Sequence, residues 1–176
     1  TISKFCTDEF KIHLSNKYEK FNRIKILHSS QIYPSIKLKW NTKPIILHNC
    51  NGYNKGQSTI MHLQKKAPQY IFNKLDCNGD EGLIKLWNKK KEYIYKNCDI
   101  FLQLSLSEGY GYSALDALFC GLPVVATNVG LFYEDLPEDC FVKLDYKKSD
   151  ALDYVIDKIN YAWKNKELIT KRAYNW

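Results

Sequence analysis

The sequence predicts an α/β fold, a parallel sheet with helices on both faces. Short apolar runs alternate along the chain with segments in which apolar residues recur at helical spacing. The run DIFLQLS (99–105) is apolar almost throughout, as expected for a strand that is buried on both faces of a parallel sheet. Glycine and proline punctuate the ends of these segments. No internal repeat is visible.

The first half of the chain contains two predicted helices and two predicted strands. A helix is expected over 7–21, where four apolar residues form one stripe behind an acidic start, and a strand is expected over 23–30. Pro34 and Pro44 bracket a linker-like stretch. KPIILHN (43–49) then predicts a buried strand, NGYNKG (51–56) a loop, and the residues from Ser58 to Pro68 a helix.

The second half continues the alternation. Strands are expected over 70–75, 99–105, 123–127 and 141–146. A turn at 78–80 precedes a helix over 81–97, whose lysine-rich outer face is best explained by solvation. A helix over 112–120 is closed by Gly121 and Pro123, and a final helix or helix pair spans 150–174.

Composition sets the broad class. With 176 residues the chain is about one domain, and its net charge of +7 is compatible with nucleotides, nucleic acid or a membrane surface as partners. The six cysteines show no C-x-x-C pair and no metal-ligand spacing, which favours free thiols in a reducing compartment. No transmembrane run or signal peptide is visible, so we expect a soluble, cytoplasmic protein, and the first residue, Thr1, indicates a missing N-terminus.

The most informative stretch is SEGYGYSALD (107–116), between an expected strand and an expected helix. Ligands of parallel sheets bind beyond the carboxyl ends of the strands, glycines allow close backbone approach, and helix N–H groups can hold an anion. Glu108 and Asp116, eight residues apart, could accept hydrogen bonds from two pairs of hydroxyls. These features describe a nucleotide-sugar site. The structural alternative is a tight turn in which Glu108 caps the helix and Asp116 is solvated.

A second interpretation of the same stretch is a dinucleotide site. Gly109 to Ala114 satisfies G-x-G-x-x-A between a strand and a helix. That mechanism requires an acid about 20 residues later, at the end of the next strand, for the ribose. Asn128 to Gly130 contain no acid, and Glu134 comes too late, so a dinucleotide-binding Rossmann domain is disfavoured.

The segment from Ser105 to Gly130 resembles the signature of retaining glycosyltransferases of the GT-B fold, in the large family 4 (group 1). The shared pattern is S-x-x-E-G-[FY]-G, a second acid, then G-x-P-V-[VI]-A-[ST] and a glycine turn. KPIILHNCNGYNKG is similar to the first strand and loop of that family's C-terminal domain. The resemblance implies a Rossmann-like, donor-binding domain over 41–176, preceded by a segment (1–40) that leads from a missing N-terminal domain.

The resemblance also implies roles for individual residues. Glu108 matches the acid that contacts the donor sugar and supports the transition state, and Asp116 matches the acid that binds the ribose. Lys55 matches the lysine that holds the diphosphate; its alternative is an exposed loop lysine. The backbone of the glycine turn would face the phosphate and sugar (Gly109, Tyr110, Gly111 and Tyr112). The donor would be a nucleoside-diphosphate sugar, and no metal and no other cofactor is expected.

Three departures from the family pattern limit these implications. The second acid is Asp116 rather than glutamate, and the arginine that usually accompanies the lysine is replaced by amides and a thiol at 49–51. The N-terminal domain, with its acceptor site and catalytic histidine, is missing; the four histidines are better explained as ordinary strand or surface residues. A degenerate domain kept for binding or assembly therefore stays an alternative. Nucleic-acid binding rests only on the net charge, and we expect no nucleic-acid partner.

Overall fold

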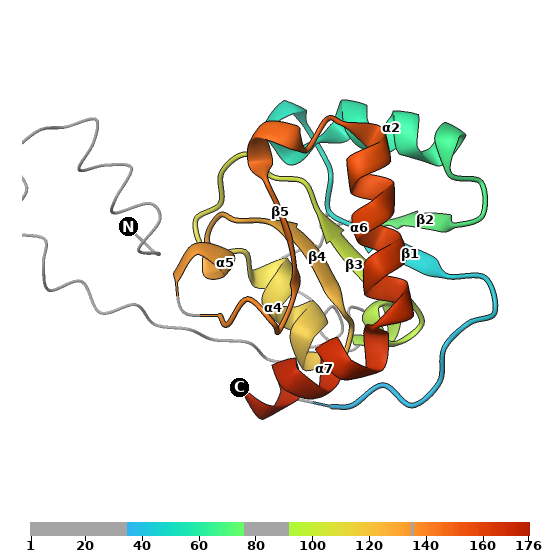
Figure 1. The fold of residues 1–176 in the computed structure, drawn as a ribbon, viewed down its shortest axis with the longest axis vertical. Coiled ribbons are helices and arrows are strands. Elements are labelled where there is room, and N and C mark those ends of the chain that lie inside the picture. Colours follow the sequence, from blue (N-terminus) through green and yellow to red (C-terminus); the bar gives the residue numbers. More distant parts are fainter. Residues whose placement is uncertain (1–34, 76–91, 135) are drawn as a thin grey trace, which may run out of the picture.

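The computed structural model describes residues 35–75, 92–134 and 136–176 (Figure 1). The strands in this part of the chain are β1 (Ile45–His48), β2 (Ile71–Lys74), β3 (Ile100–Gln103), β4 (Val124–Thr127) and β5 (Val142–Leu144). The helices are α2 (Gln57–Lys66), α4 (Tyr112–Phe119), α5 (Leu131–Glu134), α6 (Leu152–Lys164) and α7 (Lys166–Asn175), with the short 3-10 turns η2 (Tyr53–Lys55) and η4 (Tyr146–Lys148).

The five strands form one parallel sheet in the order β2-β1-β3-β4-β5. The register places Ile46 of β1 opposite Ile100 of β3, and Phe101 of β3 opposite Val124 of β4. After β1 the chain steps outward to β2 and then returns to the other side of β1 as β3. The strand order therefore reverses between β1 and β3, which is the position where open parallel sheets bind ligands.

Successive residues of the strands point to opposite faces, and both faces are covered. Ile46, Ile100 and Leu102 belong to an apolar cluster with α2 and α6, whereas Leu47 and Phe101 belong to a second cluster with α4. Every residue of β3 and β4 is buried. The two edge strands are partly exposed. Continuous apolar runs in the middle of the sheet and weaker ones at its edges follow from this arrangement.

The predicted fold class is confirmed, and most predicted elements are observed within one to three residues of their expected ends. The segment over 150–174 is a helix pair, in which Asn165 separates α6 from α7. The helix α5 was not predicted. The helix over 7–21 and the strand over 23–30 lie outside the described residues, as does the start of the helix over 81–97, of which residues 92–96 are helical.

The linker-like segment that follows Pro34 has no helix or strand, but hydrogen bonds attach it to the rest of the domain. The Ser35 N–H donates to the carbonyl of Phe119 at 2.8 Å. The buried carboxylate of Asp99 accepts from the backbone N–H of Asn41 at 3.1 Å and of Ile45 at 2.9 Å. These hydrogen bonds hold the residues before β1 against the amino end of the sheet.

The four cysteines that the structure describes, Cys50, Cys98, Cys120 and Cys140, are all buried free thiols, as predicted; Cys6 and Cys77 lie outside the described residues. Burial raises the pKa of Cys98 to about 11. Among the described helices, none has the length and apolar character needed to cross a bilayer.

Candidate functional site

The candidate site lies at the carboxyl ends of β1 and β3, where the strand order reverses. Two loops leave the sheet there, one over residues 49–56 and the other over 104–111. The Leu106 N–H in the second loop donates to the carbonyl of Asn54 in the first at 2.8 Å. This backbone hydrogen bond holds together two loops that are about fifty residues apart in sequence.

The structure brings two predicted site residues into direct contact. The Nζ of Lys55 forms an ion pair with Oε1 of Glu108; the two side chains are 34% and 10% exposed. The same oxygen accepts a hydrogen bond from the Ser105 hydroxyl at 2.6 Å. The carbonyl of Ser105 in turn accepts from Thr127 Oγ1 at 2.5 Å, at the end of β4. Glu108 is therefore held by Lys55 and Ser105, from the loops that follow β1 and β3, and Thr127 supports Ser105. Lys55 is paired and only partly exposed, unlike a solvated loop lysine.

The predicted glycine turn forms the start of α4. Gly111 caps the helix in the left-handed conformation, with φ at +94°. Tyr110 is buried, and its ring lies 5.3 Å from the partly exposed ring of Tyr112. The carbonyl of Tyr110 accepts from the Leu131 N–H at 2.7 Å, so the loop after β4 supports the turn. The backbone of Gly109 to Tyr112 thus lies beside Glu108, at the positive end of a helix.

Asp116 lies in the second turn of α4 and is only 4% exposed. The alternative in which this residue is solvated is therefore wrong. Its contact with a ribose stays a prediction.

Residues 49–51, where the resemblance leads us to expect an arginine, are two asparagines and Cys50. Cys50 is buried beside the site, and burial raises the pKa of its thiol to about 12. The thiol therefore carries no charge at neutral pH and contributes neither attraction nor repulsion toward a phosphate. Lys55 is the cation that these two loops bring to the candidate site.

Two of the four histidines can be placed. His48 is the last residue of β1 and is buried; its Nδ1 accepts a hydrogen bond from the Cys50 N–H at 3.3 Å. His62 lies on the exposed side of α2. Both are ordinary strand or surface histidines, as predicted. His13 and His28 lie outside the described residues.

Sequence reasoning missed the residues that support Glu108. Ser105 begins the S-x-x-E spacing, which places a hydroxyl within reach of the carboxylate, so this contact had a local signal. Thr127 and Asn54 had no such signal, because each forms a hydrogen bond with a backbone group of a segment far away in sequence. No group of three or more His, Cys, Asp or Glu side chains suited to a metal ion occurs within residues 35–75, 92–134 and 136–176.

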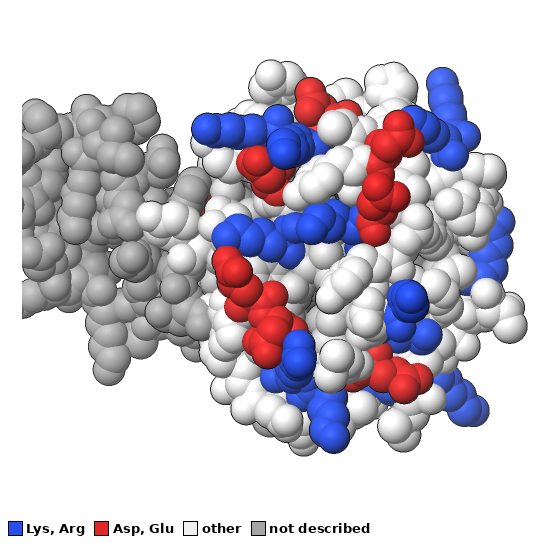
Figure 2. All heavy atoms as spheres, in the orientation of Figure 1, with Lys and Arg blue, Asp and Glu red and all other residues white. Residues whose placement is uncertain are grey.

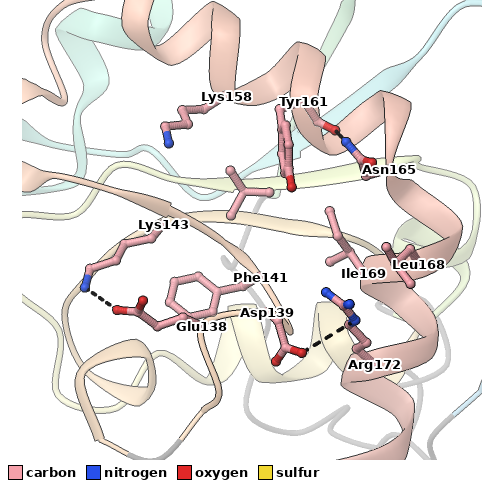
Figure 3. A pocket seen from close by; sticks show the side chains of 11 residues that line it. Glu138, Asp139, Phe141, Lys143, Lys158, Tyr161, Asn165, Leu168, Ile169 and Arg172 are labelled. Atoms are coloured by element: carbon pink, nitrogen blue, oxygen red, sulfur yellow. Dashed lines mark hydrogen bonds and ion pairs between the residues drawn. The ribbon is translucent and has the colours of Figure 1, made fainter.

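A hollow lies between β5 and the helices α6 and α7, away from the candidate site (Figure 3). Its volume is about 410 Å³. The charged groups around it are largely paired with one another: Lys143 contacts Glu138 at 2.7 Å, and Arg172 contacts Asp139 at 3.5 Å. None of the predicted site residues lines this hollow. Because its charged side chains largely pair with one another, they do not indicate a charged ligand.

The surface seen in Figure 2 carries Lys and Arg side chains interspersed with Asp and Glu side chains. No broad area of positive charge alone is visible on this face. The net charge of +7 is therefore not concentrated here into the kind of basic stripe that binds a nucleic-acid backbone.

Comparison with known families identifies the class of domain. The family model described as "Glycosyl transferases group 1" matches residues 81–175, more than half of the chain. The curated relative "O-antigen biosynthesis glycosyltransferase WclY" from Escherichia coli is 36% identical over 75 residues. The match covers 43% of this chain and 20% of WclY, so the chain corresponds to a small part of that relative.

Solved structures share the fold. Sucrose-phosphate synthase from Thermosynechococcus elongatus aligns with a TM-score of 0.58 at 20% identity, covering 76% of this chain and 40% of that enzyme. The C-terminal domain of the group 1 glycosyl transferase LpcC from Francisella tularensis aligns with a TM-score of 0.51 at 19% identity, covering 82% of this chain and 92% of that domain. At such identities the likeness concerns the fold alone.

Proposed function

Because the chain belongs to the family of glycosyl transferases, group 1, we propose that it is the donor-binding half of such an enzyme. It would bind a nucleoside-diphosphate sugar over the carboxyl ends of β1 and β3. The complete protein would transfer the sugar, with retention of configuration, to an acceptor held by a separate N-terminal domain. The four buried free thiols suit a reducing, cytoplasmic location for this reaction.

The observation that carries the proposal is the ion pair between Lys55 and Glu108. An ammonium group has three donors, so Lys55 can bind a phosphate oxygen while it keeps one bond to Glu108. Pairing with Glu108 holds the lysine side chain in the site before the ligand arrives, which reduces the entropy lost on binding.

The same geometry suggests how the chain lowers the barrier to transfer. As the bond between sugar and diphosphate breaks, negative charge accumulates on the leaving diphosphate. Lys55 and the N–H groups at the start of α4 would stabilise that charge. Glu108, fixed by Ser105 at 2.6 Å, would accept hydrogen bonds from the sugar and lie near the positive charge that develops on it. Asp116 would accept hydrogen bonds from the ribose hydroxyls.

A calorimetric titration of the chain with UDP, GDP and ADP tests the proposal. We expect one of these nucleotides to bind, and the Lys55→Ala variant to bind it at least about tenfold more weakly, since a charge-assisted contact is lost. Lys66→Ala is the matched control, because Lys66 also forms an ion pair, with Asp153 at 2.7 Å, but lies on α2 away from the site. It should bind like the wild type.

The full-length protein separates an enzyme from a degenerate binding domain. Glu108→Gln should reduce sugar transfer by at least about 100-fold while the nucleotide still binds, because the carboxylate is required in the transition state. Glu138→Gln, which breaks the exposed pair with Lys143, should leave transfer unchanged. The proposal fails if none of the three nucleotides binds. Binding without any Glu108 dependence of transfer would favour the degenerate domain.

A further inference from the structure

Gln103 is a fully buried polar residue for which the described part of the chain offers no partner. It ends β3, has no exposed surface, and neither Nε2 nor Oε1 has a hydrogen bond there. An amide buried without hydrogen bonds is unfavourable, whereas an apolar side chain of similar size would not be. Its neighbours along the chain, Phe101, Leu102 and Leu104, are all apolar and buried. Packing alone therefore does not explain a glutamine here.

The amide of Gln103 lies directly beneath the start of α4. A Cβ added to Gly111 would lie 3.7 Å from both Nε2 and Oε1, an ordinary van der Waals distance. Gly111 is the residue that caps α4. On the neighbouring strand end, Oδ1 of Asn49 is a second buried amide atom without a partner among the described residues. Buried amide atoms without a partner among the described residues thus lie at the carboxyl ends of both β1 and β3.

We propose that Gln103 is a positioning residue for the donor site, acting through the backbone of the turn over 109–112. When a diphosphate binds to the N–H groups at the start of α4, the turn shifts so that one of its backbone carbonyls accepts a hydrogen bond from Nε2 of Gln103. This hydrogen bond is present only in the bound state, so it favours binding. This inference rests on the proposed function, since it assigns Gln103 a role in supporting the residues that would contact the donor.

The test compares Gln103→Met with the wild type. Methionine matches the length and unbranched shape of glutamine without its amide. We expect the free energy of unfolding in urea to stay equal or to rise, because an unpaired buried amide is removed. At the same time the affinity for whichever of UDP, GDP and ADP the wild type binds should fall about fivefold to tenfold. A purely structural residue would not separate stability from affinity in this way.

Leu102→Met is the matched control, since Leu102 is equally buried in β3 but faces α2 and α6. It should not change the affinity. In the wild-type chain, the NMR signals of the Gln103 side-chain amide should shift and exchange more slowly with water when the nucleotide is added, which tests the proposal even if a variant fails to fold. Unchanged affinity in Gln103→Met, or unchanged amide signals, overturns the proposal. Absence of nucleotide binding by the wild type would instead refute the proposed function, and this inference with it.

Discussion

At the scale of single residues, two glycines shape the loops of the candidate site. Gly56 caps α2 and Gly111 caps α4, and both have left-handed backbone conformations, with φ at +74° and +94°. They differ in their surroundings. A Cβ at Gly56 would lie 2.5 Å from Cβ of Leu104, whereas a Cβ at Gly111 has room. The first glycine is therefore needed for conformation and for space, the second for conformation alone.

This difference predicts unequal losses of stability. Gly111→Ala should lower the free energy of unfolding by about 1–2 kcal/mol, the cost of a left-handed alanine. Gly56→Ala should lower it by about 2–4 kcal/mol, because overpacking against Leu104 is added. Urea denaturation of both variants measures the two values. Equal losses would show that the loop relaxes around the new methyl group and that the close contact has no energetic weight.

His48 makes stability depend on pH. Burial, with a smaller contribution from Lys74, lowers the pKa of this imidazole from 6.5 to about 4. Between these values the unfolded chain binds a proton that the folded chain does not, so stability is complete above pH 6.5 and falls as the pH decreases toward 4. The loss should be about 3 kcal/mol in total.

Urea denaturation from pH 7.5 to 4 in the wild type and in His48→Asn isolates this contribution. Other groups titrate in both proteins, so the difference between the two curves is the measured quantity. We expect that difference to change by about 3 kcal/mol across the window. Parallel curves would mean that His48 is protonated in the folded protein, or that its side chain becomes exposed to solvent below pH 6.

At the scale of elements, α7 holds the amino end of the sheet. Ile169 of α7 is 4% exposed and joins the apolar cluster beneath α6, whereas the adjacent Leu168 is 49% exposed. Thr170 Oγ1 donates to the carbonyl of Gly121, just after α4, at 3.3 Å. At the junction of the two helices, the Lys166 ammonium lies 4.2 Å from the ring centre of Trp163. One side of α7 is thus buried against the domain, and the other side is exposed to solvent.

Two neighbouring leucine-sized residues of α7 should therefore respond differently to truncation. Ile169→Ala should destabilise the protein by about 2–4 kcal/mol, because it removes buried methyl groups and leaves a cavity. Leu168→Ala should change stability by less than about 1 kcal/mol, since half of its surface is already in water. Thermal unfolding compares the pair. Similar losses would contradict the packing of α7 described above.

The elements that sequence reasoning predicted are those with a strong local pattern. The run over 99–105 predicted β3 because both faces of a central strand are buried. Gly121 and Pro123 predicted the end of α4 because they stop a helix. The helix α5 was missed since four residues are too few to show a helical period. The apolar stripe over 150–174 continues through Asn165, so the break between α6 and α7 stayed open.

The candidate site was predictable only in part, and for a related reason. The spacing of Glu108 and Asp116 within one motif is local, and so is the glycine turn between them. The ion pair of Lys55 with Glu108 joins residues 53 apart, and it depends on the order of the strands. Gln103 had no signal, because one polar residue within an apolar strand does not reveal whether its amide is paired. Contacts between the ends of different strands can be predicted only when the order of the strands in the sheet is known.

At the scale of the whole molecule, the net charge of +7 and the local site make separate predictions about anions. Diffuse positive charge attracts any polyanion, and such binding weakens steeply with salt because counterions are released. A nucleotide held by Lys55 and the start of α4 depends on a few fixed contacts. Its affinity should therefore change much less over the same range of salt.

We expect the chain to bind a single-stranded oligonucleotide only weakly and to lose about 100-fold or more in affinity between about 50 and 200 mM salt. The nucleotide that binds in calorimetry should lose less than about tenfold over this range. Lys55→Ala should weaken nucleotide binding at least about tenfold. It should leave oligonucleotide binding nearly unchanged, because it removes one charge of many. Fluorescence anisotropy with a labelled oligonucleotide gives the first measurement. If oligonucleotide binding resists salt and depends on Lys55, the site serves nucleic acid, and a sugar donor is the wrong ligand.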